Sequence, residues 1–265
     1  MAVQNDRKLN LLERTLPEGL LVDAAWMERH GYSTSLRSQY VSAGWLVQPV
    51  RGTYKRPLGE LDWQKVVVSL QTLMGQNLTV GGSTALDLQG VSHFISASGP
   101  PTVHLYGPKP PPGWLAKLPL KTKFRFHRST VLFKNLATTE EVQEGALREL
   151  PGPTDRPLIA STPERALLEL LDELPHRESF HNVDMLVEGL RTLSPRRLQA
   201  LLADCRSVKV KRLFFWFADR HQLPWLKQID RASLDLGTGK RMLVKGGKLD
   251  PRYLITVPGD LNAPV

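Results

Sequence analysis

A short polar run without acidic residues, residues 33–43, is the first stretch of the sequence whose side chains could do specific chemistry. Hydroxyl, amide and guanidinium groups can hydrogen-bond to DNA bases and phosphates, whereas a carboxylate would be repelled by the phosphate backbone. Thr34 on this run is predicted to hold a phosphate. The side chains predicted to contact base edges are those of Ser35, Arg37, Ser38 and Gln39.

A basic turn follows this run almost directly. Two short extended segments, residues 46–50 and 53–56, flank Arg51-Gly52 and predict a two-stranded ribbon with an arginine at its tip. Such a tip can reach the DNA backbone or the minor groove beside a helix in the major groove. The cationic side chains predicted to bind phosphates here are those of Arg51, Lys55 and Arg56.

Three helices are expected to position these side chains, over residues 7–16, 22–29 and 33–43. The third helix begins at Ser33 or Thr34, both of which are suitable N-caps. Its inward positions are Leu36, Tyr40 and Ala43. This order of helices before a basic ribbon is typical of a winged helix-turn-helix that binds double-stranded DNA, and we assign it to residues 1–57. The alternative is a three-helix surface that docks another protein.

The net charge of +9 favours a polyanionic partner, of which nucleic acid is the commonest. Residues 1–57 carry +3, residues 58–190 carry −3 and residues 191–265 carry +9, so the C-terminal third is the most basic. This third is expected either to add DNA contacts or to be an ordinary solvated surface. The residues of this possible auxiliary basic face are Lys209, Lys211, Arg212, Arg220, Lys240 and Arg241.

No pattern in the sequence predicts catalysis, a metal or a cofactor. Cys205 is the single cysteine, so neither an internal disulfide nor a thiolate cluster can form, and a reducing compartment is favoured. The histidines are scattered, and no pair has the spacing of metal ligands with a third ligand at hand. They are His30, His93, His104, His127, His176, His181 and His221. We therefore expect a protein that is not an enzyme.

A glycine-rich turn, residues 81–84, joins an expected strand to an expected helix. Backbone amides at such a turn can bind phosphate. However, the turn lacks the Lys-Ser/Thr ending of a P-loop and the spacing of a dinucleotide-binding fingerprint. We interpret it as a tight structural turn capped by Ser83 or Thr84.

The remaining sequence predicts a larger mixed α/β domain over residues 58–265, so the fold class is α+β. Helices are expected over residues 63–74, 85–88, 163–174, 181–193, 195–204 and 208–221. The last of these is expected to expose its basic side chains. Strands are expected over residues 78–80, 102–106, 121–127 and 253–257, with a hairpin of residues 232–236 and 241–244.

The whole chain resembles the AbiEi antitoxins of type IV toxin–antitoxin systems, first recognised as phage abortive-infection loci. The N-terminal helices and ribbon carry part of this resemblance, together with an ordered series of short motifs. These motifs are Gly82-Ser83-Thr84-Ala85-Leu86 with Gly90, Ser161-Thr162-Pro163-Glu164-Arg165-Ala166, Leu190-Arg191 with Leu193, Val210-Lys211-Arg212-Leu213, Asp235-Leu236-Gly237 with Gly239-Lys240-Arg241, and Asp250-Pro251 with Tyr253.

The resemblance implies a protein with two roles. Its winged helix would repress its own operon by binding inverted repeats in the promoter. Its larger domain would counter a nucleotidyltransferase-like toxin without forming a stable complex with it. The family implies no cofactor and no catalytic residues.

Two other functions remain open at this point. The chain could be a winged-helix transcription factor whose larger domain senses a ligand or a protein, or an RNA-binding or nuclease-associated module that uses the basic C-terminal face. The polar start of the sequence lacks the apolar core of a signal peptide, and no apolar run is long enough to span a bilayer. A cytoplasmic protein is therefore expected.

Overall fold

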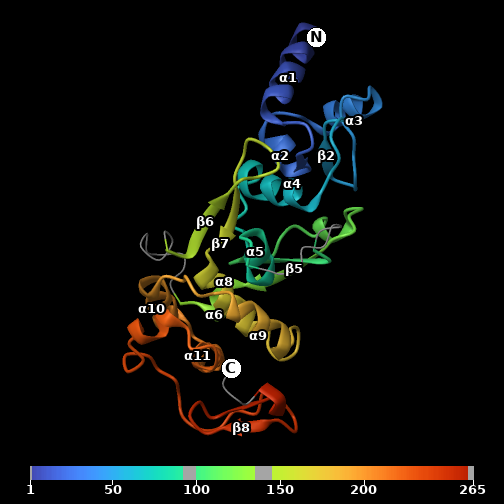
Figure 1. Ribbon diagram of the computed structural model, residues 1–265. Coiled ribbons are helices and arrows are strands. Elements are labelled where there is room, and N and C mark those ends of the chain that lie inside the picture. Colours follow the sequence, from blue (N-terminus) through green and yellow to red (C-terminus); the bar gives the residue numbers. More distant parts are fainter. Residues whose placement is uncertain (1, 92–99, 135–144, 262–265) are drawn as a thin grey trace.

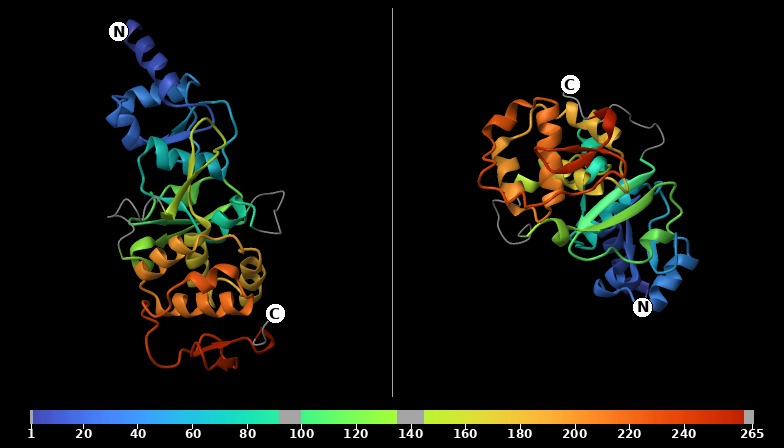
Figure 2. Two further views of the ribbon diagram at one scale, coloured as in Figure 1. Left: turned by 60° about the vertical axis from the view of Figure 1, so that its left-hand side comes forward. Right: turned by 90° about the horizontal axis from the view of Figure 1, so that it is seen from below.

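Four regions follow one another along the long axis of the molecule in the computed structural model, which describes residues 2–91, 100–134 and 145–261 (Figure 1). The N-terminal helices lie at one end, and a central sheet and a layer of helices come next. The C-terminal segment that includes β8 lies at the opposite end, and a second view shows the same order (Figure 2). Within the described ranges, no helix is both long enough and apolar enough to cross a membrane.

The N-terminal region consists of α1 (Ala2–Thr15), β1 (Leu21–Asp23), α2 (Ala24–Arg29), α3 (Thr34–Ser42) and β2 (Thr53–Lys55). β1 pairs antiparallel with β2, and Val47 forms an isolated bridge on the other side of Lys55. The predicted two-stranded ribbon of residues 46–50 and 53–56 is therefore present only as the single bridge between Val47 and Lys55. The predicted second helix begins at Ala24, because the residues before it form β1 and the Asp23 side chain caps the helix by accepting a hydrogen bond from Trp26 N at 2.8 Å.

The third predicted helix is confirmed as α3, with Ser33 as its N-cap. The Ser33 hydroxyl accepts a hydrogen bond from Leu36 N at 3.3 Å. Leu36 and Tyr40 are buried as expected, whereas Ala43, predicted to face inward, is exposed. Ala43 is the C-terminal cap residue of the helix.

The central sheet has five strands in the order β5-β4-β3-β7-β6. Its strands are β3 (Thr79–Val80), β4 (Thr102–Gly107), β5 (Lys123–Arg128), β6 (Leu147–Leu150) and β7 (Leu158–Ser161). The β3–β7 and β4–β5 pairs are parallel and the β3–β4 and β6–β7 pairs are antiparallel. The expected strands over residues 78–80, 102–106 and 121–127 correspond to the first three.

The connecting elements are α4 (Trp63–Val68), a π-helical turn (Ser69–Leu73), α5 (Gly82–Leu88), a 3₁₀ turn (Leu115–Lys117) and α6 (Ser129–Leu132). Ser69 joins the N-terminal region to this part of the chain. Its hydroxyl accepts a hydrogen bond from Leu21 N at 3.0 Å and donates one to Lys65 O at 2.6 Å. These bonds connect β1 of the N-terminal region to α4 and the π-helical turn.

α8 (Pro163–Glu173) is the central helix of the larger region and is buried on nearly every side. It lies between the sheet and three further helices, α9 (Phe180–Glu188), α10 (Pro195–Asp204) and α11 (Val208–Arg220) (Figure 1). Three of its buried residues are glutamates, Glu164, Glu169 and Glu173. A buried carboxylate is costly unless it is paired, so each of these side chains must find a partner.

Glu169 supplies a hydrogen-bond acceptor for the backbone of the glycine-rich turn at the start of α5. Its carboxylate accepts hydrogen bonds from Gly82 N at 3.0 Å and from Arg165 Nε at 2.7 Å. A Cβ atom at Gly81 would lie 2.2 Å from Glu169 Oε2, so glycine is required for this close approach. The prediction that Ser83 or Thr84 caps the turn is wrong, because the carboxylate of Glu169 takes that place.

The C-terminal segment contains a 3₁₀ turn (Pro224–Gln228), β8 (Lys248–Asp250), β9 (Ile255–Val257) and a last 3₁₀ turn (Gly259–Leu261). β8 and β9 form an antiparallel pair. The predicted hairpin of residues 232–236 and 241–244 is wrong, since neither range forms a strand. Instead, the guanidinium of Arg212 on α11 fixes the carbonyl groups of Leu236 and Gly239, each at 2.7 Å. These bonds hold the chain against α11 in place of a strand partner.

Candidate nucleic-acid interface

The outward face of α3 is polar, exposed and free of acidic side chains. α3 lies in the N-terminal part of the molecule, away from the central sheet (Figure 1). Its sequence, TSLRSQYVS, contains no Asp or Glu. The predicted contact residues that the structure leaves exposed on this helix are Thr34, Ser35, Ser38 and Gln39.

The turn that carries Arg51 is exposed and well supported. Thr53 N donates a hydrogen bond to Val50 O at 3.0 Å, and Gly52 between them has a positive φ of 85°, which favours glycine. Gly52 O accepts a hydrogen bond from Ala24 N at 2.8 Å, so the turn is tied to the start of α2. Arg51 is thus an exposed cation on a fixed turn.

Arg37 does not lie where the sequence predicted. Its side chain is buried, and it donates hydrogen bonds to Ala24 O and to Thr34 Oγ1, both at 2.7 Å. The guanidinium also lies 5.7 Å from the centre of the Tyr54 ring. In this conformation Arg37 links α3 to α2 and β2 and is not presented to base edges, so the expected base contact is replaced by a structural role.

Lys55, which was expected to bind phosphate, is also buried. Its ammonium group donates to four carbonyl groups of the following loop, at 2.8 to 3.2 Å. Burial lowers the pKa of Lys55, and nearby Lys65 lowers it further, while Glu18 opposes the shift. The ammonium therefore stabilises the loop of residues 56–59 and is not available to a phosphate.

Arg56 is partly exposed, and its charge is paired with two glutamates of the N-terminal region. Its Nε lies 3.0 Å from Glu18 Oε1, and its Nη2 lies 3.8 Å from Glu13 Oε1. These ion pairs connect β2 to α1 and the loop that follows it. The predicted phosphate contact of Arg56 would have to compete with both carboxylates.

The basic residues predicted to be exposed on α11 are mostly engaged with their own chain. Arg212 and Lys211 are 3% and 4% exposed, so the expectation that they face solvent is wrong. Lys209 donates to Asp172 O at 2.6 Å and to Leu174 O at 2.8 Å. Arg220 pairs with Asp184, at 2.9 Å from Nε to Oδ1. α11 is covered by neighbouring segments on the side that the periodicity assigned to solvent.

Lys240 and Arg241 are the two residues of the predicted auxiliary face that are exposed. They precede β8 and belong to the C-terminal segment at the far end of the molecule from α3 (Figures 1 and 2). These two cations and α3 therefore lie at opposite ends of one copy of the chain.

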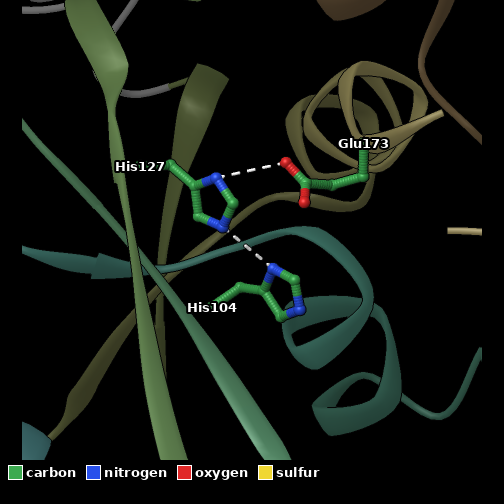
Figure 3. Close-up of side chains that lie close together, drawn as sticks. All are labelled: His104, His127 and Glu173. Atoms are coloured by element: carbon green, nitrogen blue, oxygen red, sulfur yellow. Dashed lines mark hydrogen bonds and ion pairs between the residues drawn. The ribbon is translucent and has the colours of Figure 1, made fainter. Parts of the chain in front are cut away.

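The structure brings together three residues that the sequence analysis left apart. His104 on β4, His127 on β5 and Glu173 on α8 meet within hydrogen-bonding distance (Figure 3). Burial and the neighbouring His127 together lower the pKa of His104 to about 4. The spacing of the histidines in the sequence gave no sign of this group, because it depends on the register of two parallel strands. His93 lies outside the described residues.

Comparisons with known proteins agree with the architecture. A family model for a transcriptional regulator described as an AbiEi antitoxin of type IV toxin–antitoxin systems matches residues 100–258. A model for the N-terminal domain of AbiEi antitoxin transcriptional regulators matches residues 5–97. None of the curated proteins matches the chain.

A solved structure, described as that of the RV2827C protein from Mycobacterium tuberculosis, has a similar fold. The two chains superpose with a TM-score of 0.57 at 18% identity, over 94% of this chain and 89% of the other. That likeness concerns the fold alone, whereas the two family models together span nearly the whole chain. The protein therefore belongs to the AbiEi antitoxin family of transcriptional regulators from type IV toxin–antitoxin systems.

Proposed function

We propose that this antitoxin represses its own operon by binding inverted repeats in the promoter, and that it counters a nucleotidyltransferase-like toxin. In this proposal residues 1–57 form a winged helix-turn-helix and residues 58–265 carry the antitoxin activity. The observation that supports the DNA-binding part is an exposed, acid-free face on α3 beside an exposed arginine on a fixed turn.

The exposed residues have different roles in this proposal. Ser35, Ser38 and Gln39 contact base edges in the major groove, because hydroxyl and amide groups can donate and accept hydrogen bonds there. Thr34 and Arg51 hold phosphates and set the position of α3. The buried or paired cations of the module, Arg37, Lys55 and Arg56, keep these groups in place and make no base contact.

A promoter–reporter assay tests the DNA-binding part. We expect the full chain to repress a reporter fused to its own promoter, and the triple substitution Ser35→Ala, Ser38→Ala and Gln39→Ala to relieve repression. A double substitution at the far end, Lys240→Ala with Arg241→Ala, is the matched control and leaves repression intact. Equal repression by the wild type and the triple variant, at equal protein levels, would contradict the proposal.

Co-expression with the product of the neighbouring gene tests the antitoxin part. If that product is a nucleotidyltransferase-like toxin, we expect the chain to restore growth without co-purifying with it. The triple variant of α3 should restore growth as well as the wild type does, because residues 58–265 carry this activity. Failure of both proteins to restore growth would favour a plain transcription factor instead, and binding of structured RNA in preference to promoter DNA would favour an RNA-binding module.

A further inference from the structure

His104, His127 and Glu173 form a polar cluster on one face of the sheet. His104 and His127 lie on adjacent parallel strands, and Tyr106 lies opposite His127 in the register. The side chains of His104, Tyr106 and His127 therefore lie on the same face of the sheet, and Tyr106 stacks on the His127 ring with centroids 4.5 Å apart. Glu173 approaches from the last turn of α8 (Figure 3). Side chains of His127 and Glu173 are only 9% and 4% exposed.

The hydrogen bonds fix which nitrogen atoms are free to bind a ligand. His127 Nδ1 lies 3.1 Å from Glu173 Oε1, so it carries a proton and donates it to the carboxylate. In the neutral ring this leaves a lone pair on His127 Nε2, which faces His104 Nδ1 at 3.0 Å (Figure 3). A histidine that donates one ring N–H to a carboxylate and presents the other nitrogen is the usual arrangement of a metal-binding histidine.

A second observation concerns the other carboxylate oxygen. Glu173 Oε2 is buried and has no hydrogen-bond partner among the described residues. A buried carboxylate with an unsatisfied oxygen is costly, and the positive charge of an ion on the other nitrogen of His127 would offset part of that cost. One potential ligand atom from each of the three residues lies within 4.8 Å of those of the other two, so the carboxylate is close enough to act on an ion bound by the two rings.

We propose that His104 Nδ1 and His127 Nε2 bind a divalent transition-metal ion of the Zn²⁺ class, while Glu173 orients the His127 ring by accepting the proton of its other nitrogen. Imidazole nitrogen suits Zn²⁺, Co²⁺, Ni²⁺ and Cu²⁺, whereas Mg²⁺ and Ca²⁺ prefer sites made of oxygen. Two Zn–N bonds at a tetrahedral angle place their nitrogen atoms about 3.3 Å apart. The present separation is 3.0 Å, so a small outward movement of the two rings accommodates the ion. Because a neutral ring keeps one proton, His104 carries its proton on Nε2 when the ion binds Nδ1, and no net proton is released.

The ion would connect the edge of the sheet to the central helix. β4 and β5 each supply one ligand, and the C-terminal end of α8 supplies the carboxylate that orients His127. Its binding would therefore stabilise the larger region independently of DNA and toxin, because a ligand that binds only the folded chain raises its melting temperature.

Titration of the chelator-treated full chain with Zn²⁺ and Co²⁺ tests this proposal. We expect one ion per chain, visible Co²⁺ absorption typical of nitrogen and oxygen ligands, and a rise in melting temperature with Zn²⁺. His104→Gln and His127→Gln should each weaken binding at least 100-fold, and Glu173→Gln about 10- to 100-fold. His181→Gln is the matched control, because His181 pairs with a carboxylate, Asp260, on an exposed surface.

Two results would overturn the proposal. One is wild-type affinity in both histidine variants, and the other is loss of binding in His181→Gln, which would place the ion on the surface. If the histidine variants fail to fold, ring-nitrogen NMR of the wild-type protein decides the question. We expect the signals of His104 Nδ1 and His127 Nε2 to move on Zn²⁺ addition while those of His181 stay in place, and unchanged signals for the first two would contradict the site.

Discussion

The N-terminal module and the C-terminal third differ in how their positive charges are used. The C-terminal third has fifteen Lys and Arg residues against six Asp and Glu, whereas residues 1–57 have eight against five. Yet the α11 cations at 209, 211, 212 and 220 are buried or bound to their own chain, whereas other cations of this third, such as Arg196 and Lys245, are exposed. The N-terminal module, with less net charge, offers an exposed arginine beside an acid-free helix face. The charge of α11 therefore serves internal contacts, and only cations that the fold leaves exposed can contact a polyanion.

Among the substitutions that test this difference, that of Arg212 should have the largest effect on the free energy of unfolding. We expect Arg212→Met to lower the free energy of unfolding by about 3 kcal/mol, because it removes a buried guanidinium that donates to the carbonyl groups of Leu236 and Gly239. Lys245→Met, an exposed lysine of the same segment, is the control and should change it by less than about 0.5 kcal/mol. Urea unfolding measures both. If Arg212→Met is as stable as the wild type but binds DNA more weakly, Arg212 contacts DNA and is not structural.

Cys205 gives an independent measure of the same region. Burial raises the pKa of its thiol to about 11, so little thiolate is present at pH 8 in the folded protein. We expect slow modification by a thiol reagent in the wild type and in Lys245→Met, and faster modification in Arg212→Met because the C-terminal region opens more often. Fast modification of the wild type would show that the region is not packed as described.

Arg37 tests whether a buried cation of the N-terminal module is structural. We expect Arg37→Ala to destabilise the protein by about 2 kcal/mol, because it leaves Ala24 O without its donor and removes the contact with Tyr54. The ratio between operator and random-sequence affinity of the folded variant should stay the same. A stable variant that has lost this ratio would show that Arg37 reads base edges after all.

Arg51 provides the contrasting exposed cation of that module. We expect Arg51→Ala to weaken binding to all duplexes about three- to tenfold and to reduce the slope of log affinity against log salt by about 0.9, the value for one phosphate contact. Its free energy of unfolding should not change. Equal salt slopes for Arg51→Ala and the wild type would remove Arg51 from the interface.

The smallest effect is expected at the far end of the molecule. Lys240→Glu combined with Arg241→Glu should leave the salt slope on a duplex with one repeat unchanged, since these residues lie in the C-terminal segment. On a duplex with two repeats, the salt slope of this variant should fall below that of the wild type only if Lys240 and Arg241 of neighbouring copies contact the DNA. A lower slope on the single repeat would show that the C-terminal segment touches the same DNA as α3.

Local sequence patterns were sufficient for most elements of the fold. Capping residues and leucine spacing placed α3, α8, α10 and α11 within one or two residues of their observed ends. They could not show which polar groups are covered, because burial of Arg212 and Arg37 depends on segments far away in the chain. On β5, Phe124 and Phe126 lie on one face of the strand and His127 on the other. This alternation in the sequence does not show that α8 covers the face that carries His127.

The histidine cluster illustrates the same limit. His104 and His127 each lie on a strand that the sequence predicted, but their meeting depends on a parallel pairing whose register places Tyr106 opposite His127. Parallel strands are joined by long connections, so no local turn fixes this register in the sequence. Glu173 then joins the pair only because α8 packs across the sheet.

The most direct test of the DNA-binding assignment is the ratio of affinities for the promoter duplex and a scrambled duplex at one fixed salt concentration. The ratio should be measured for the wild type, for Ser35→Ala, Ser38→Ala, Gln39→Ala combined, and for Lys240→Ala with Arg241→Ala. We predict that the triple substitution lowers the ratio at least tenfold, because each base contact contributes about 1–3 kcal/mol of discrimination, and that the C-terminal pair leaves it unchanged. An unchanged ratio in the folded triple variant would contradict the assignment of α3 as the helix that reads the promoter.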